Sequence, residues 1–185
     1  ISMHPEKNVP ITIFCGNGNN GGDGLAMARI LLAEHYNVQV ILSSSQKRSE
    51  ENKINLSSLK ESNPTCIAFF SPSLQLPEHG FIIDALLGTG LQGALRDEET
   101  EMIQFINKQK LSILSIDIPS GMFADMDQQT SVAVQANYTL TFQQYKQSFL
   151  FPEAFKFTGK VIVLPIGLHS DYYHQTATTS YLIDK

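Results

Sequence analysis

The sequence has no tryptophan, only two cysteines, and no apolar run approaching the ~18 residues of a membrane span. Cys15 and Cys66 each stand in an apolar run, with no CxxC spacing and no neighbouring histidine. We therefore expect buried free thiols in a reducing compartment. The beginning of the sequence also lacks the pattern of a secretory signal. Together these absences predict a cytoplasmic protein with no membrane association.

Basic charge is scarce as well. Thirteen Lys and Arg stand against 18 Asp and Glu, a net charge of −5, so nucleic acid is a disfavoured partner. The five histidines form no pair with zinc-ligand spacing, and no G-x-S-x-G motif supports a serine hydrolase. What is abundant is glycine and aspartate in the loops that follow apolar runs.

Apolar β-branched runs alternate with amphipathic stretches along the chain, which predicts an α/β fold. Its central sheet should be mostly parallel, with helices on both faces. The length suits a single domain, which we place at 1–168, with 169–185 as a polar tail or linker. Strands are expected at 10–16, 37–44, 65–70, 80–88, 111–121, 138–144 and 160–168, and helices at 24–36, 49–62 and 96–110.

The first loop, "FCGNGNNGGDGLA" (14–26), contains the spacing G-x-G-x-x-G of a dinucleotide-binding turn. The next helix is expected to start near Asp23 or Gly24, so that its N–H groups face an anion. The alternative is a tight turn in which Asp23 is only the N-cap. The second predicted strand ends in "LSSSQKR" without the acid of ordinary NAD enzymes, and no G-K-[ST] follows the first loop.

The second loop follows "GFIIDALLG", in which Asp84 interrupts an apolar strand. A carboxylate in such a place is costly unless it is paired, hydrogen-bonded or bound to a cation, and a structural hydrogen bond is the simplest alternative. The glycines after it, Gly88, Gly90 and Gly93, could form an anion nest. Arg96 could assist there or simply face solvent at the start of a helix.

The third loop, "SIDIPSG", places Asp117 at a strand end and offers the hydroxyl of Ser120. Because parallel strands end at one edge of the sheet, Asp23, Asp84 and Asp117 could meet around one pocket. Oxygen ligands of this kind suit a hard cation, and carboxylate acid/base catalysis is the chemistry best supported by these residues.

Three runs in order resemble the NAD(P)HX epimerase family, also called the YjeF N-terminal domain family: "CGNGNNGGDGLAMARIL", "IIDALLGTGLQGALR" and "ILSIDIPSGMFAD". A weaker match is "TLTFQQYKQSFLFPEAFKFTGKVIVLPIGL", and together they cover about 11–168. The resemblance implies a Rossmann-like three-layer α/β/α sandwich. It also implies epimerisation of the R and S forms of hydrated NADH and NADPH.

The resemblance implies that Asn20, Asp84 and Ser120 coordinate a potassium ion. Our own hypothesis is that Asp23 or Asp117 is the general acid/base, because either route of inversion needs proton transfers. The residues implied to contact the hydrated nucleotide are Asn19, Asn20, Gly21, Gly22, Asp23, Gly88, Thr89, Gly90, Leu91, Gln92, Gly93, Ala94 and Asp117.

The resemblance also implies partners. Family members act with an ADP- or ATP-dependent dehydratase, fused or separate, and "SYLIDK" resembles the connector of a bifunctional form. They usually carry an N-terminal helical segment that contributes to a homodimer, whereas here the first strand is expected near Pro10. Two other functions stay open: a non-catalytic module that binds nucleotide, protein or RNA, and a dinucleotide-dependent oxidoreductase. The missing acid after the second strand counts against the oxidoreductase.

Overall fold

A computed structural model describes residues 6–45, 47–125 and 132–167. The predicted tail, 169–185, lies outside these residues. The strands are β1 (Ile11–Cys15), β2 (Val38–Leu42), β3 (Ile67–Phe69), β4 (Phe81–Ala85), β5 (Ser112–Ile116), β6 (Tyr138–Phe142) and β7 (Lys160–Leu164). The helices are α1 (Asn19–Ala33), α2 (Glu50–Ser62), α3 (Asp97–Asn107) and α4 (Phe155–Thr158), with 3₁₀ turns η1 (Pro64–Cys66), η2 (Gln147–Leu150) and η3 (Pro152–Ala154).

The strands form one sheet in the order β3-β2-β1-β4-β5-β6-β7, and every neighbouring pair is parallel. The chain builds outward from β1 to β3 on one side and then restarts at β4 on the other. This reversal is a topological switch point, where an α/β sheet opens a crevice at the carboxyl ends of its strands. Phe14, Asp84 and Ser115 are paired across this centre and so point to the same face.

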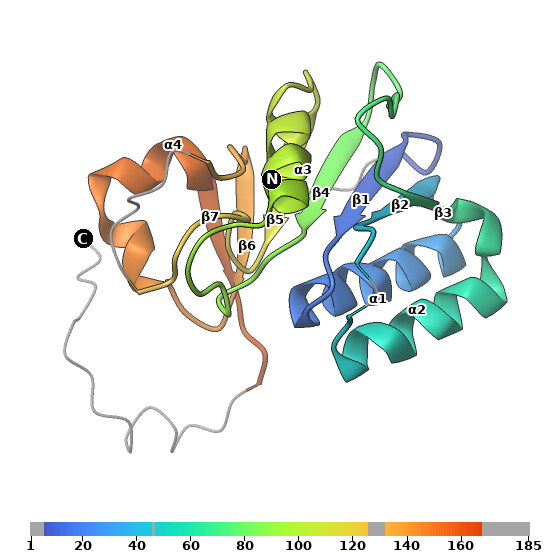
Figure 1. The fold of residues 1–185 in the computed structure, drawn as a ribbon, viewed down its shortest axis with the longest axis horizontal. Coiled ribbons are helices and arrows are strands. Elements are labelled where there is room, and N and C mark those ends of the chain that lie inside the picture. Colours follow the sequence, from blue (N-terminus) through green and yellow to red (C-terminus); the bar gives the residue numbers. More distant parts are fainter. Residues whose placement is uncertain (1–5, 46, 126–131, 168–185) are drawn as a thin grey trace.

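Two apolar cores lie on opposite faces of the sheet, which makes three layers (Figure 1). On one face α1 and α2 bury Leu25 and Leu59 against alternate residues of β1 and β2. On the other, α3 buries Met102 and Ile106 against Phe14 and its neighbours. This arrangement confirms the predicted α/β/α sandwich, and the sheet is parallel throughout.

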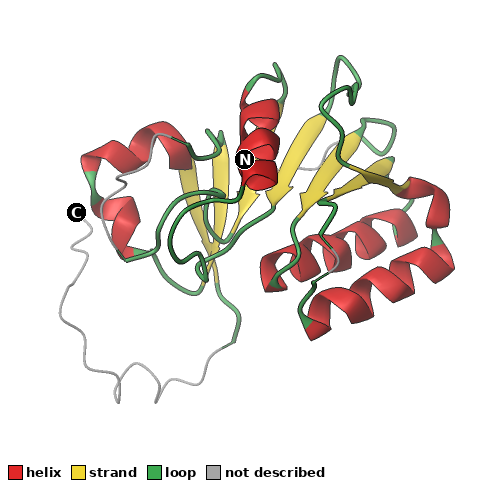
Figure 2. Ribbon diagram, viewed as in Figure 1, coloured by secondary structure: helices red, strands yellow, loops and turns green. Residues whose placement is uncertain are grey.

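A third cluster closes the β7 end of the sheet. Phe149 of η2, Ala154 of η3 and Phe157 of α4 pack with Ile118 and Met122, which follow β5. Figure 2 shows the long loops that leave the strand ends in this half of the molecule. Within the described residues, we find no helix with the length and apolar character needed to cross a bilayer.

All seven predicted strands are present, but the predicted start of the first helix is wrong. The helix begins at Asn19, not near Asp23 or Gly24, and Gly18 is its N-cap. Asp23 therefore lies more than one turn inside α1 and does not cap it. The Asn-Asn-Gly-Gly segment has low helix propensity, but tertiary contacts override that preference. Two of these contacts are hydrogen bonds: the side chain of Asn20 donates to the carbonyl of Leu87 at 2.9 Å, and the side chain of Asn52 donates to the carbonyl of Gly18 at 3.0 Å.

The close approach of α1 to the sheet gives a first prediction. A Cβ on Gly24 would lie 2.6 Å from Cβ of Ala85 and 2.9 Å from Sγ of Cys15, both fully buried. Gly24→Ala should therefore lower the free energy of unfolding by about 1–3 kcal/mol in urea denaturation, although alanine favours helix. Gly90→Ala is the control because nothing lies within 4 Å of its Cβ position. Equal stability of the two variants would contradict the close packing.

Candidate functional site

A cavity of about 640 Å³ opens at the switch point, beside the carboxyl ends of β1, β4, β5 and β6. This volume is within the range of roughly 300–1,000 Å³ typical of small-molecule sites. Its wall combines the start of α1, the loop after β4, the start of α3 and the ends of β5 and β6. The lining residues are Gly18, Asn19, Asn20, Asp23, Leu86, Leu87, Gly88, Thr89, Gly90, Leu91, Gln92, Ala94, Arg96, Glu99, Asp117 and Phe142.

The glycines of the first motif divide into two roles. A Cβ on Gly16 would lie 1.8 Å from the carbonyl oxygen of Leu86, and one on Gly21 would lie 2.1 Å from that of Gly16. These two glycines permit close backbone packing. Gly18 has open space at its Cβ position and lines the cavity. The first N–H groups of α1 are therefore presented beside the cavity, where they favour an anion.

Asn20 connects α1 to the loop after β4. Its side-chain Nδ2 donates to the carbonyl of Leu87 at 2.9 Å, and its Cβ lies 3.1 Å from the Cβ position of Gly88, so a larger residue there would crowd it. Its Oδ1 atom is buried and has no hydrogen-bond partner among the described residues. An amide oxygen in that state is available to a ligand or cation.

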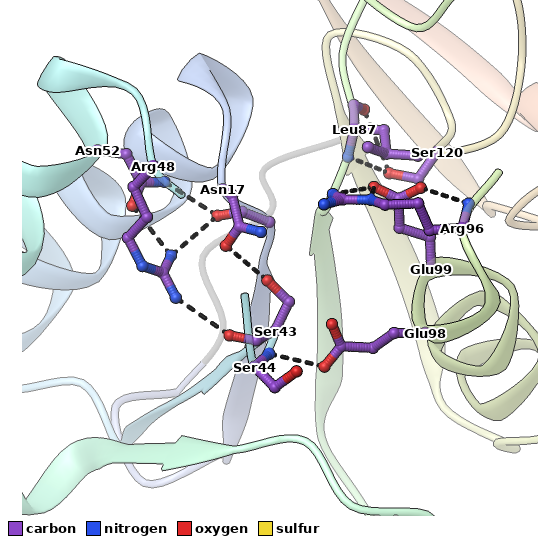
Figure 3. A network of polar contacts seen from close by, with 11 residues as sticks. Asn17, Ser43, Ser44, Arg48, Asn52, Leu87, Arg96, Glu98, Glu99 and Ser120 are labelled. Carbon is purple, nitrogen blue, oxygen red and sulfur yellow. Dashed lines mark hydrogen bonds and ion pairs between the residues drawn. The ribbon is translucent and has the colours of Figure 1, made fainter. Parts of the chain in front are cut away.

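The turn before α1 is held from behind by α2 (Figure 3). The buried side chain of Asn52 donates from Nδ2 to the carbonyls of Gly16 and Gly18, at 2.9 and 3.0 Å. Arg48 donates to Oδ1 of Asn52 and to the carbonyl of Ser43, both at 3.1 Å. This clamp fixes the backbone at the start of α1, which lines the cavity.

Asp84 is fully buried and accepts four hydrogen bonds from neutral donors. Ser115 Oγ and the Ser120 N–H donate to Oδ2 at 2.7 and 2.9 Å, and Ser120 Oγ and the Leu86 N–H donate to Oδ1 at 2.5 and 3.2 Å. Burial raises the pKa of Asp84, and these hydrogen bonds oppose the rise. The structural hydrogen bonding that the sequence left as an alternative is thus present.

Ser120 connects Asp84 to the cavity wall by hydrogen bonds. Its hydroxyl accepts from the N–H of Leu87 at 2.8 Å, and Leu87 lines the cavity. Its own N–H and hydroxyl are both committed to Asp84. Asp84 thereby ties the loop after β5 to the loop after β4.

Asp23 and Asp117 face the same cavity from different elements. Partial desolvation and then the negative charge of Asp117 raise the pKa of Asp23 above its ordinary value. Asp117 has a left-handed φ of 66° and donates its N–H to the carbonyl of Leu140 at 2.7 Å. Its carboxylate pairs with Lys146 at 2.8 Å. The cavity therefore contains two carboxylates in different electrostatic surroundings.

The opposite wall carries an ion pair. Glu99 of α3 accepts from the N–H and the guanidinium of Arg96, which starts the helix, and both residues line the cavity. Nearby, Glu98 Oε1 accepts a hydrogen bond of 2.6 Å from the N–H of Ser44 (Figure 3). This bond connects α3 to the loop after β2. Arg96 thus lies at the cavity, which agrees with the hypothesis that it assists the glycine-rich loop after β4.

The cavity brings together ten of the thirteen residues expected to contact a nucleotide: Asn19, Asn20, Asp23, Gly88, Thr89, Gly90, Leu91, Gln92, Ala94 and Asp117. The other three, Gly21, Gly22 and Gly93, are not among its lining residues in the part of the chain that the structure describes. Gly21 and Gly22 instead approach Asn52, so they serve helix packing. Asp84 and Ser120 lie beneath the wall formed by Leu87.

Sequence reasoning missed Asn52, Lys146, Glu99 and Phe142. Asn52 and Glu99 stand inside amphipathic helices, where a polar residue gives no signal of its own. Lys146 and Phe142 come from the far end of β6, about 25 residues beyond Asp117. Only the strand order, which places β6 beside β5, brings them to the site.

Comparison with known proteins agrees with this geometry. The family model described as YjeF-related protein N-terminus matches residues 3–148. The chain belongs to this family. The YjeF N-terminal match spans both glycine-rich loops and the Asp117 loop, that is, most of the cavity wall.

Curated relatives carry repair-enzyme names. The chain is 33% identical over 185 residues to the bifunctional NAD(P)H-hydrate repair enzyme Nnr of Coxiella burnetii, covering 100% of the chain and 37% of that protein. It is 31% identical over 176 residues to the NAD(P)H-hydrate epimerase of Rhodopirellula baltica, covering 94% and 71%. The chain thus spans about a third of the bifunctional relative.

The fold has a solved counterpart. The crystal structure of yeast ynu0 superposes with a TM-score of 0.72 at 19% identity, covering 97% of this chain and 79% of that one. At this identity the likeness establishes the fold. The YjeF N-terminal fold of the chain is therefore supported by sequence and by structure independently.

The clamp behind the first turn predicts the effect of its removal. Asn52→Ala leaves the carbonyls of Gly16 and Gly18 without their buried donor, which should lower the free energy of unfolding by about 1–3 kcal/mol. Asn55→Ala, three residues along the same helix, is the control because the hydrogen bonds of Asn55 are exposed. Urea denaturation of both variants would measure this. A loss of stability in Asn55→Ala as large as in Asn52→Ala would contradict a specific clamp.

Proposed function

We propose that this chain epimerises the R and S forms of hydrated NADH and NADPH, a nicotinamide nucleotide repair reaction. The observation that carries the proposal is the pair of carboxylates, Asp23 and Asp117, which face one cavity beside the amide end of α1. Relatives named NAD(P)H-hydrate epimerase support the enzyme over the non-catalytic binding module.

The reaction inverts a ring carbon that is bonded to the ring nitrogen and carries the added hydroxyl. Inversion requires breaking and remaking either the C–O or the C–N bond, and each route needs proton transfers. In the first route, a protonated hydroxyl leaves as water, and water then adds to the other face and releases a proton. In the second, the hydroxyl loses its proton and becomes an aldehyde as the C–N bond opens, and the ring nitrogen takes up a proton. Rotation of the aldehyde and reclosure on its other face then reverse both proton transfers. Both routes conserve atoms and need one proton donor and one acceptor.

Asp23 and Asp117 can supply these two roles. The raised pKa of Asp23 favours its protonated form as the donor. Asp117, which pairs with the ammonium of Lys146, is the proposed acceptor. The N–H groups at the start of α1 and the loop 88–94 would bind the pyrophosphate. The nucleotide is then a substrate and not a redox cofactor.

Potassium is the proposed cofactor, and the local atoms fit it. Among the described residues no three His, Cys, Asp or Glu side chains gather to hold a metal, so the available ligands are amide, hydroxyl and carbonyl oxygens with a single carboxylate. The unpartnered Oδ1 of Asn20 and the buried carboxyl group of Asp84, whose hydrogen bonds within the described residues all come from neutral donors, suit a weakly charged hard cation. Asn20, Asp84 and Ser120 would hold it, and its charge would also strengthen nucleotide binding.

The proposal extends to partners and location. The S form would pass to an ADP- or ATP-dependent dehydratase, either fused as in the bifunctional relatives or separate. A homodimer and a cytoplasmic location complete the proposed setting.

Removal of each carboxylate tests the assignment. Asp23→Asn and Asp117→Asn should each slow R/S exchange of hydrated NADH by about 10²–10⁴-fold, because general acid–base catalysis supplies that factor. Chromatography of the two epimers over time measures the rate, after subtraction of the enzyme-free reaction. Asp97→Asn, which changes an exposed aspartate at the start of α3, is the matched control. Near-normal rates in both site variants would overturn the acid/base assignment.

Potassium binding can be measured without activity. A cation that binds only the folded protein raises its stability by about 2.7 kcal/mol at 100 times its Kd. We expect a higher Tm in potassium chloride than in choline chloride at equal ionic strength. Asn20→Ala should lose this difference, and Asn19→Ala should keep it. A wild-type protein with the same Tm in both salts would contradict the cation site.

A further inference from the structure

Lys146 forms a largely buried ion pair with Asp117 at the edge of the cavity. Its Nζ lies 2.8 Å from Asp117 Oδ1, and the two side chains are only 16% and 13% exposed. The Oδ1 atom itself is buried, whereas Asp117 lines the cavity. Oδ1 is therefore turned to the lysine, and Oδ2 is the carboxylate oxygen left to face the cavity.

The backbone holds both partners in this arrangement. Asp117 and Gln143 adopt left-handed φ values of 66° and 67°, which are uncommon for residues other than glycine. Gln143 reverses the chain after β6, and its N–H donates to the carbonyl of Leu164 at 2.7 Å. This reversal brings Lys146 back to the end of β6, where Nζ also lies 3.3 Å from the carbonyl of Phe142.

We propose that Lys146 is a positioning residue for the proposed epimerisation: its ion pair fixes the Asp117 carboxylate through Oδ1 and leaves Oδ2 for the cavity. The inference rests on the proposed function and deepens it, because it identifies Asp117 as the proton acceptor and Asp23 as the donor. Lys146 acts through Asp117 and is not among the residues that line the described cavity.

The other charged groups at the cavity do not replace this cation. Asp23 of α1 is a carboxyl group and supplies no positive charge, and Glu99 is bonded to Arg96 on the α3 side. The carboxylate of Asp84 beneath the wall is held by Ser115, Ser120 and Leu86. Among the described residues, Lys146 is the cation that pairs directly with Asp117.

The test compares Lys146→Met, Lys146→Arg and the exposed control Lys110→Met in the epimerisation assay. Lys146→Met should lower kcat at least tenfold with a change in KM below threefold, because Asp117 acts in the transition state. Lys146→Arg, which keeps the positive charge, should recover most of the lost kcat, and Lys110→Met should match wild type.

A double variant separates this role from a general loss of structure. If Lys146 acts through Asp117, Asp117→Asn with Lys146→Met should be no slower than Asp117→Asn alone. A wild-type kcat in Lys146→Met, or additive losses in the double variant, would overturn the inference. Thermal melts identify any variant that fails to fold. If Lys146→Met does not fold, a tenfold loss of kcat in a folded Lys146→Arg variant would overturn the inference, and a kcat near that of wild type would support it. An inactive wild-type protein would instead overturn the proposed function.

Discussion

The site depends on the buried carboxylate of Asp84. It lies in the middle of a parallel sheet, between β1 and β5, and accepts hydrogen bonds from Ser115, Ser120 and Leu86. A charge in this place is tolerated only because these donors replace water. Since Ser120 also binds the N–H of Leu87, the same carboxylate sets the position of the two loops that form the centre of the cavity wall.

Two asparagines and two aspartates complete the site around Asp84. Asn20 bonds the loop after β4 and thereby joins α1 to the wall, while Asn52 clamps the turn that precedes α1. Asp23 and Asp117 then face one cavity under different influences, one beside a like charge and the other beside a lysine. Rigid supports of this kind hold two identical side chains in different electrostatic surroundings, which is what the proposed donor and acceptor roles require.

The sequence predicts the strands well because each is a short apolar run bounded by glycine, proline or polar residues. It also indicates which loops meet, since parallel strands end at one edge. It misplaces the start of α1, because the Asn-Asn-Gly-Gly segment is held in a helix by contacts with α2 and β4 that local propensity does not contain. The sequence does not reveal the roles of Asn52 and Lys146 for the same reason: each contacts residues about thirty or more positions away in the chain.

The central claim is that the cavity at the switch point binds hydrated nicotinamide nucleotide. Nuclear magnetic resonance titration of the ¹⁵N-labelled chain with an equilibrated mixture of hydrated NADH epimers tests it most directly. The account predicts saturable shifts at the backbone amides of Asn19, Asn20, Gly88 and Thr89, with NADH producing weaker ones. Saturable shifts confined to a second cavity, between Phe70 after β3 and Phe105 of α3, would contradict it.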